Sequence, residues 1–270
     1  IFSMHTALDN SVLGVNNMIC DKLGLINRQI LIPQAQTIKK LITFVPKNEA
    51  DTLRNALFEA GAGSIGNYNN CSFNTEGIGT YKGNEASNPT LGKKGEIHFE
   101  NETQIAVTFP RHLESNILKA LFKTHSYEEV AYEVTTLENK NQQIGMGMIG
   151  ELEQEMSETD FLNTLKTNMK TETIRHSGLL QKNIKKVAVL GGSGSFAIHA
   201  AKAAQADVFV TADLKYHDFF TAENQIVLAD IGHYESEQFT KNLLVAYLTK
   251  KITNFAIVLS KTNTNPVKYF

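Results

Sequence analysis

The chain has 270 residues, of which 42% are hydrophobic and 20% are charged, and its formal net charge is −2. This is the composition of a globular protein with enough chain for two domains. The near-neutral charge, without a basic block, argues against nucleic acid as a partner. No apolar run approaches the roughly 20 residues that span a bilayer, so no membrane partner is expected either.

The cysteines and the start of the chain bear on its cellular context. Cys20 and Cys71 are far apart and belong to no CxxC pair. Because no signal peptide is recognisable either, we expect a reduced, cytoplasmic protein whose two thiols are buried. The first five residues, which begin at Ile1, are expected to end a strand whose partner segment would lie upstream.

Polar side chains follow this opening strand. His5 and Asp9 come next, and residues 11–19 lead into a helix that is predicted to end near Gly24. In open α/β sheets, ligands bind beyond the carboxyl ends of the strands. Alternatively, Asp9 caps the helix and the His5 ring packs against the sheet. The local sequence does not decide between the ligand site and this structural role.

The pattern changes between about residues 39 and 138. Strands are predicted over residues 40–46, 71–73, 77–81, 95–100, 104–109 and 129–134, and helices over residues 49–60 and 113–123. This order, β-α-β-β-α-β with an extra hairpin, is typical of a ferredoxin-like α+β domain. Two glycine-rich turns, residues 61–63 and 77–79, are expected to serve backbone geometry, because neither is followed by the lysine of a P-loop.

A second α/β pattern starts at Gly145. Ser157 is a candidate N-cap for a helix over residues 158–167. Further elements are strands over residues 186–190, 207–211 and 225–229 and a helix over residues 197–204. We expect these strands to form one parallel sheet with the opening strand. Residues 39–138 would then be an insertion into a discontinuous core made of residues 1–38 and 139–270.

The glycines after residue 190 allow an alternative function. Gly192-x-Gly194-x-x-Ala197 fits the loose dinucleotide pattern, and Asp213 lies where a ribose-binding acid would be. An NAD(P)-binding oxidoreductase is therefore an alternative, although little chain remains for a Rossmann domain. Phe196 occupies the last position of a G-x-S-x-G frame, which argues against a serine hydrolase.

The last predicted strand leads into the motif on which the functional prediction depends. Gly232 allows a sharp turn, and residues 235–250 carry apolar residues at helical spacing. His233 and Glu237 would project from one face of this helix, and such a pair can hold a divalent metal. The alternative is a surface histidine and a glutamate that favours the positive end of the helix dipole. Glu235 is expected to point into solvent, away from His233.

Candidate ligands therefore gather at strand ends of one predicted sheet: His5, Asp9, His233 and Glu237, with His217 after another strand. Two metals about 4 Å apart need bridging carboxylates and several histidines. Asp9 and Glu237 could bridge two ions. The visible histidines are too few for two coordination shells unless an upstream segment supplies more.

Several motifs follow one another along the chain. They are His5-Thr6-x-x-Asp9 with Gly14-Val15-Asn16, Gly191-Gly192-Ser193-Gly194-Ser195, Thr211-Ala212-Asp213-x-x-Tyr216-His217 and Asp230-Ile231-Gly232-His233-Tyr234-Glu235-Ser236-Glu237. Together they resemble the NGG-interacting-factor-three-like family, whose members are often labelled GTP cyclohydrolase I type 2 homologues. The insertion resembles the PII/CutA-like domain of the longer members, through Gly61-Ala62-Gly63-x-Ile65-Gly66-x-Tyr68 and His125-Ser126-Tyr127-Glu128-Glu129-Val130-Ala131-Tyr132. Ser126 stands where the family usually carries proline.

This resemblance implies a dinuclear metal site in which Asp9, His233 and Glu237 match ligand positions. His5 matches a motif histidine near the metals, and His5 and His217 are the residues expected to act in catalysis. The two divalent ions could be zinc, iron, manganese or magnesium. The resemblance also implies a homohexamer. The paired-histidine motif that precedes the His5 motif in the family does not occur in this sequence.

The leading hypothesis is therefore a metal-dependent hydrolase that acts on a nucleotide or another small molecule. A second hypothesis is a non-enzymatic metal-binding scaffold or sensor whose PII-like insertion binds an effector. The oxidoreductase is the third.

Overall fold

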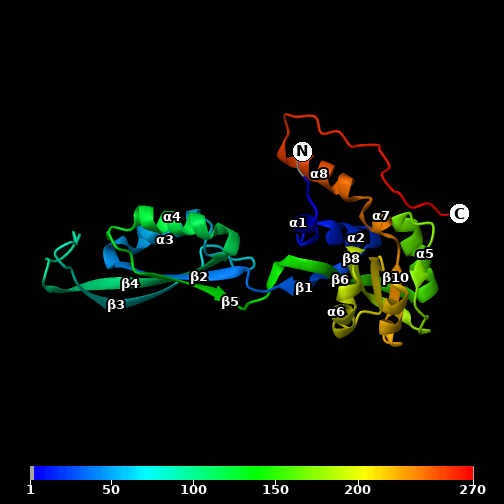
Figure 1. Cartoon of the computed structure of the whole chain (residues 1–270), viewed down its shortest axis with the longest axis horizontal. Coiled ribbons are helices and arrows are strands. Elements are labelled where there is room, and N and C mark those ends of the chain that lie inside the picture. The colour runs from blue at the N-terminus through cyan, green and yellow to red at the C-terminus, as the bar shows by residue number, and fades with distance from the viewer. Residues whose placement is uncertain (1–2, 270) are drawn as a thin grey trace. The chain divides into compact units, whose positions relative to one another are not determined.

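The computed structural model describes residues 3–269, and within this range no helix is long and apolar enough to cross a membrane. The chain divides into two compact units. Unit 1 consists of Ile1–Gln34 and Gln142–Phe270, and unit 2 of Ala35–Asn141. The sequence placed these borders at residues 38/39 and 138/139. Most helices and strands of both units are labelled in Figure 1.

Unit 1 contains a six-stranded sheet in the order β1-β6-β8-β9-β10-β7. Its strands are β1 (Ile26–Gln34), β6 (Asn141–Ser157), β7 (Arg175–His176), β8 (Asn183–Ser193), β9 (Val208–Ala212) and β10 (Val227–Asp230). β8, β9 and β10 run parallel, whereas β6 pairs antiparallel with β8 and β7 pairs antiparallel with β10. The expected parallel sheet is thus a mixed one. The chain makes a crossover connection between β8 and β9 and another between β9 and β10, as parallel neighbouring strands require.

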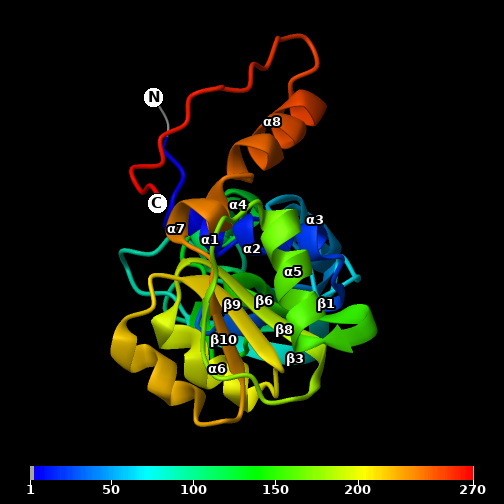
Figure 2. The same ribbon diagram turned by 90° about the vertical axis from the view of Figure 1, so that its right-hand side faces the viewer.

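Helices cover both faces of the three parallel strands (Figure 2). One hydrophobic cluster joins α2 and α5 to strand residues such as Val189 and Val210, and the other joins α6 to the intervening Ala188 and Phe209. Because the strands are buried on both faces, their sequences read as continuous apolar runs. The helices of this unit are α1 (Thr6–Asp9), α2 (Val15–Leu23), α5 (Glu158–Met169), α6 (Ile198–Ala203), α7 (His233–Glu237) and α8 (Thr240–Lys251), with 3-10 helices η3 (Ser195–Ala197) and η4 (Tyr216–Ala222).

Local signals placed several helix ends correctly. Gly24, with φ of 65°, ends α2, and the Ser157 hydroxyl accepts a hydrogen bond from the Asp160 N–H at 3.1 Å at the start of α5. The single helix expected over residues 235–250 is wrong, because the helix is interrupted after α7 and resumes as α8. No residue of α8 is fully buried. Of the expected opening strand, residues 1–2 lie outside the described residues, and residues 3–5 are not in a strand.

Unit 2 is an antiparallel sheet in the order β3-β4-β2-β5 with two helices. Its elements are β2 (Ile38–Pro46), a 3-10 turn (Lys47–Glu49), α3 (Ala50–Glu59), β3 (Phe73–Lys82), β4 (Ile97–Pro110), a second 3-10 turn (Arg111–Leu113), α4 (Glu114–Thr124) and β5 (Tyr132–Leu137). This is the β-α-β-β-α-β order of a ferredoxin-like sandwich. The extra hairpin is absent from the described part of unit 2, because the short strands predicted over 71–81 and 95–109 are the continuous strands β3 and β4.

The two ends of unit 2 lie side by side within it. Ile38, at the start of β2, pairs with Leu137, at the end of β5. The Asn141 side-chain amide donates to Thr37 Oγ1 at 3.0 Å. Unit 2 also has a hydrophobic cluster of its own, built around residues such as Leu41 and Phe109.

Because each unit has its own core and the ends of unit 2 are adjacent, unit 1 should fold without unit 2. Replacement of residues 35–141 by a short Gly-Ser linker is expected to leave a protein with one cooperative urea transition, followed by circular dichroism. The isolated 35–141 segment should also unfold cooperatively. A broad, non-cooperative transition in the deletion protein would contradict this division.

The two cysteines differ in burial, and neither forms a disulfide. Cys20 in α2 is fully buried, and burial raises the pKa of its thiol to about 12. Cys71 is partly exposed, so the expectation of two buried thiols is wrong for this residue. It lies in the loop before β3, where its Sγ is 3.8 Å from the Asn69 carbonyl.

At pH 8 the native protein should therefore react rapidly with a thiol reagent at Cys71 only, because the Cys20 thiol is shielded and remains protonated. Denaturant should expose a second equivalent. The Cys71→Ser variant serves as the control and should lose the rapid phase. Two rapid equivalents in the folded protein would show that Cys20 is accessible.

Candidate metal centre

The turn between β10 and α7 is organised by the buried carboxylate of Asp230. Its Oδ1 accepts the Gly232 N–H at 3.0 Å, and its Oδ2 accepts the Leu214 N–H at 2.9 Å. Arg175 forms an ion pair with the same carboxylate and also donates to the Leu214 carbonyl at 2.8 Å. Asp230 therefore fixes the ends of two parallel strands, β9 and β10, relative to each other.

Gly232 turns the chain from β10 into α7. Its φ is 91°, and a β-carbon at this position would overlap the Glu235 carboxylate. Both features require glycine. The turn sets His233 as the first residue of α7, so His233 and Glu237 lie one helical turn apart.

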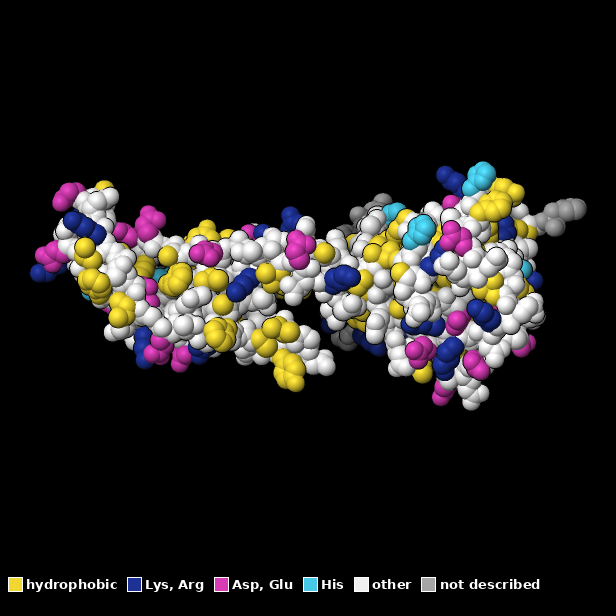
Figure 3. All heavy atoms as spheres, turned by 90° about the horizontal axis from the view of Figure 1, so that it is seen from below, with side chains coloured by type: hydrophobic (Ala, Val, Ile, Leu, Met, Phe, Trp, Pro, Cys, Tyr) yellow, Lys and Arg dark blue, Asp and Glu magenta, His cyan; other side chains and the backbone are white. Residues whose placement is uncertain are grey.

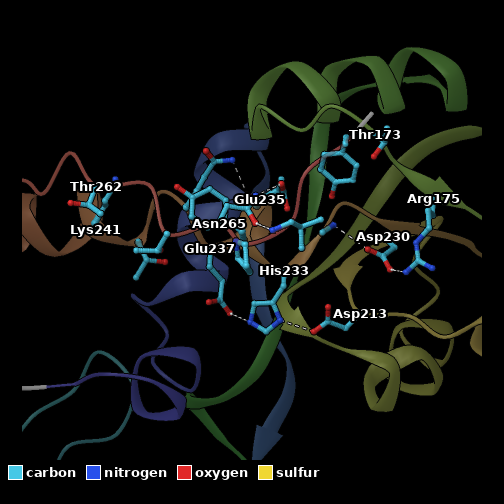
Figure 4. Close-up of a pocket in the computed structure, with 18 of the residues that line it drawn as sticks. Thr173, Arg175, Asp213, Asp230, His233, Glu235, Glu237, Lys241, Thr262 and Asn265 are labelled. Atoms are coloured by element: carbon cyan, nitrogen blue, oxygen red, sulfur yellow. Dashed lines mark hydrogen bonds and ion pairs between the residues drawn. The ribbon is translucent and has the colours of Figure 1, made fainter.

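His233 is held between two carboxylates, as Figure 4 shows. Its Nδ1 lies 2.6 Å from Asp213 Oδ2, and its Nε2 lies 3.6 Å from Glu237 Oε1. Asp213 stands just beyond β9 with φ of 57°, in the left-handed region that Asp adopts more readily than most residues. The sequence identified Asp213 only as a possible ribose ligand, and its contact with His233 was missed.

The pKa values of His233 and Glu237 are shifted by these contacts and by burial. The hydrogen bond to Asp213 raises the pKa of the His233 imidazole, burial opposes that rise, and Glu237 adds to it. Burial raises the pKa of the Glu237 carboxyl, while His233 opposes the rise. Partly desolvated carboxylates that are close together favour a bound cation, because a cation offsets both the desolvation and their mutual repulsion.

Asp9 and His5 belong to the same electrostatic cluster. Burial raises the pKa of Asp9, and both His5 and His233 lower it. His5 and Asp9 also affect the Glu237 pKa, with opposite signs. The residue at the start of the chain and those near its end are therefore brought together across more than two hundred positions of sequence. His5 itself is exposed, at the N-cap of α1.

Asn16 connects α1 to the central sheet. This buried side chain donates to the Asp9 carbonyl at 2.9 Å and accepts the Gly191 N–H at 3.0 Å. Beside it, a β-carbon on Gly192 would lie 2.7 Å from Glu237 Oε1 and 3.4 Å from His233 Nε2. The end of β8 thus forms the floor under the His233–Glu237 pair. The sequence alone indicates no role for Asn16, because its burial and its contacts with Asp9 and Gly191 depend on the tertiary fold.

The same contacts account for the glycines that suggested a dinucleotide site. Gly192 has φ of 71°, and a β-carbon on Gly194 would overlap Thr211 Oγ1. Both glycines thus allow β8 to pack closely against its neighbours. Asp213, the proposed ribose ligand, pairs with His233 instead. The oxidoreductase alternative therefore gains no support from this geometry.

The described ligand set is incomplete as a metal cage. Among residues 3–269, no three His, Cys, Asp or Glu side chains are arranged so that they alone could hold a metal ion. His217 is exposed on η4, where its ring contacts Tyr216 and Phe220. Asp9, Asp213, His233 and Glu237 are called the His233 cluster below. Within the same range, His217 makes no hydrogen bond or ion pair with this cluster. A catalytic role for His217 stays a prediction.

A pocket of about 710 Å³ opens over this cluster. Asp213, His233 and Glu237 line one side, and the chain after residue 261 lines another (Figure 4). Glu235 is buried and accepts a hydrogen bond from the Asn265 amide at 3.0 Å. The expectation that Glu235 points into solvent is wrong, because the C-terminal segment covers it.

The role of Asn16 can be tested by truncation. Asn16→Ala leaves the Gly191 N–H and the Asp9 carbonyl without their partner, so the free energy of unfolding is expected to fall by about 2 kcal/mol. Asn163→Ala, on the exposed face of α5, is the control and should change it by less than about 0.5 kcal/mol. Equal stability of the two variants in urea denaturation would remove Asn16 as the link between α1 and β8.

Comparisons with known proteins agree on one family. The sequence model described as Duf34/NIF3 (NGG1p interacting factor 3) matches residues 1–266. The GTP cyclohydrolase 1 type 2 homolog of Bacillus subtilis is 35% identical, and that of Halalkalibacterium halodurans is 36% identical. Each alignment covers all of this chain and 74% of the relative.

Solved structures give the same result. A Bacillus cereus protein related to NIF3 superposes with a TM-score of 0.85 at 36% identity, over 98% of this chain and 72% of that one. A Staphylococcus aureus protein superposes with a TM-score of 0.74 at 28% identity, over 100% of this chain and 72% of that one. The family expected from the ordered motifs is confirmed: the chain belongs to the Duf34/NIF3 (NGG1p interacting factor 3) family.

Proposed function

We propose that this protein binds two divalent metal ions at the His233 cluster and acts as a metal-dependent hydrolase on a nucleotide or another small molecule. The observation that carries the proposal is the arrangement of His233. Its Nδ1 is engaged by Asp213, and its Nε2 faces Glu237. Histidines that bind metals commonly have one ring nitrogen fixed by a carboxylate in this way, which leaves the other free for the ion.

The residues present fit part of such a centre. His233 Nε2 and the Glu237 and Asp9 carboxylates are donors suited to zinc, iron or manganese, and the carboxylates also suit magnesium. Two coordination shells need more ligands than these, and the relatives are longer than this chain. Bound divalent ions would lower the pKa of a water molecule and polarise the substrate.

The chain's own groups would do the remaining work. Asp213 accepts a hydrogen bond from His233 Nδ1 and so holds the His233 ring in one orientation. Glu237 and Asp9 supply negative charge, and Asn16 fixes the backbone that carries Asp9. His5 is exposed and within electrostatic reach of Asp9 and Glu237, so it is suited to proton transfer during hydrolysis.

The pocket suits a small charged substrate. Its volume of about 710 Å³ is within the usual range for small-molecule sites. Arg175 and Lys241 also line it and could pair with a phosphate. The relatives' name, GTP cyclohydrolase 1 type 2 homolog, agrees with a nucleotide as substrate.

A second candidate function is a metal-binding scaffold or sensor. It is favoured by the ferredoxin-like strand order of unit 2, which agrees with a PII/CutA-like insertion able to bind an effector. Turnover that depends on metal separates the two functions. The hydrolase would convert a substrate only in the presence of the ion, whereas the scaffold would bind the ion without turnover.

Self-association is part of the proposal, as the homohexamer that the family resemblance implies. Its support is a row of large apolar side chains that are exposed on one face of β3 and β4: Ile78, Ile97 and Phe99. Figure 3 shows hydrophobic side chains, in yellow, on the surface of unit 2. A monomeric protein rarely exposes a contiguous apolar patch.

Glu237→Gln tests the centre. The change keeps the shape of the side chain but removes a charge that offsets the ions, so at least one metal should be lost, together with any metal-dependent turnover, while the fold remains intact. Glu153→Gln, an exposed glutamate of β6, is the matched control. Elemental analysis and a substrate screen with and without the recovered metal give the result. Equal metal content in both variants would exclude Glu237 as a ligand.

A further inference from the structure

Unit 2 contains a second pocket, of about 500 Å³, that the metal centre does not involve. Its walls come from β2, β3, β4, the loop between β3 and β4 (residues 83–96) and the segment after α4 (residues 125–131). This volume is sufficient for a nucleobase or a molecule of similar size.

The wall of this pocket includes the carboxylate of Glu102. Glu102 lies on β4 and is only 9% exposed. Its Oε1 accepts the Tyr127 hydroxyl at 2.9 Å, while its Oε2 accepts no hydrogen bond from any described residue. A β-carbon on Gly79 would overlap Oε2, so β3 leaves space for this oxygen only because residue 79 is glycine. Oε2 is not one of the enclosed, unpaired side-chain oxygens of the described residues, so it is open to the pocket.

The donor to Glu102 is itself held in place. The Tyr127 N–H donates to His125 Nδ1 at 3.1 Å, so the proton of this buried imidazole is on Nε2, which donates to the Phe44 carbonyl at 2.8 Å. Burial and the Glu102 carboxylate raise the pKa of Tyr127, so its hydroxyl remains a donor. The phenol and the carboxylate are thus preorganised before any ligand arrives.

Aromatic rings and an anchored loop complete the pocket. Tyr81 packs edge-to-face on Tyr127 with ring centroids 5.8 Å apart. Three hydrogen bonds fasten the loop: Tyr81 Oη to the Leu91 carbonyl at 3.2 Å, Asn88 N–H to Glu128 Oε1 at 2.6 Å and Thr90 Oγ1 to the Ser126 carbonyl at 2.8 Å. The loop therefore forms a fixed wall.

We propose that this pocket binds a small planar ligand that presents two adjacent N–H donors, a ring N–H beside an exocyclic amino group, to the Glu102 carboxylate. Each carboxylate oxygen can accept two hydrogen bonds. Oε1 can therefore keep its hydrogen bond from the Tyr127 hydroxyl while each oxygen accepts one N–H of the ligand. Paired N–H donors on a carboxylate make short, strong bonds of defined direction. Tyr81 and Tyr127 supply the apolar and aromatic surface on which a flat ring packs.

Guanosine has this donor edge, whereas inosine lacks the amino group and adenosine lacks the ring N–H. Titrated calorimetrically into the whole chain, guanosine should bind saturably, and inosine and adenosine at least about tenfold more weakly. The proposal does not depend on the metal centre. Titration in the presence of EDTA should therefore give the same guanosine affinity as titration without it.

Two pairs of variants locate the site. Gly79→Ala keeps the carboxylate but displaces it, and should weaken guanosine binding at least about tenfold. Gly77→Ala, on the same strand, has open space at its β-carbon and should bind like the wild type. Glu102→Gln should weaken binding similarly, because one oxygen is replaced by a donor, whereas the exposed Glu133→Gln should not. Unfolding curves identify any variant that fails to fold, and the other pair then decides.

Equal affinities for guanosine, inosine and adenosine would overturn the proposal, as would the absence of guanosine binding by the wild-type chain. Guanosine binding that survives both Gly79→Ala and Glu102→Gln would place the ligand elsewhere and would equally refute this assignment.

Discussion

The buried carboxylate of Asp230 is the interaction on which the candidate site depends. It accepts hydrogen bonds from the residues that follow β9 and β10, and Arg175 balances its charge. With both strand ends fixed, Asp213 and His233 meet at 2.6 Å. Neither residue could orient the other if the two loops moved independently, since a hydrogen bond tolerates displacements of only a few tenths of an ångström. Asp230 is not one of the proposed metal ligands, yet it sets the geometry of residues that are proposed to bind the ion.

The sequence predicted the elements of both units better than it predicted their pairing. Caps such as Ser157 and Gly24 are local signals, and they placed helix ends correctly. The mixed sheet of unit 1 was missed because an apolar run does not reveal the direction of its neighbour. β3 and β4 were each divided into two because glycines and polar residues in the exposed part of a long strand resemble turns. β3 and the first part of β4 bury so little surface that their sequences lack the apolar alternation typical of a strand.

The candidate site shows the same division between local and distant information. The spacing of His233 and Glu237 is a helical repeat, and it can be recognised in any sequence. The partnership of His233 with Asp213, and the link from Asp9 through Asn16 to Gly191, join segments that are remote in the chain. The burial of Glu235 depends on Asn265, which approaches from the C-terminal segment. Such contacts follow from the tertiary fold, so periodicity and spacing do not contain them.

Glycine next to a carboxylate recurs in both units and has one physical meaning. Gly192 lies under Glu237, Gly232 beside Glu235 and Gly79 beside Glu102, and in each case a β-carbon would collide with a carboxylate oxygen. Gly192 and Gly232 also have positive φ, so backbone conformation alone would explain them. Gly79 has no such requirement, since it lies in a regular strand where alanine fits the backbone. Space for Glu102 Oε2 is the reason that remains, and this oxygen, which has no donor among the described residues, can receive a ligand.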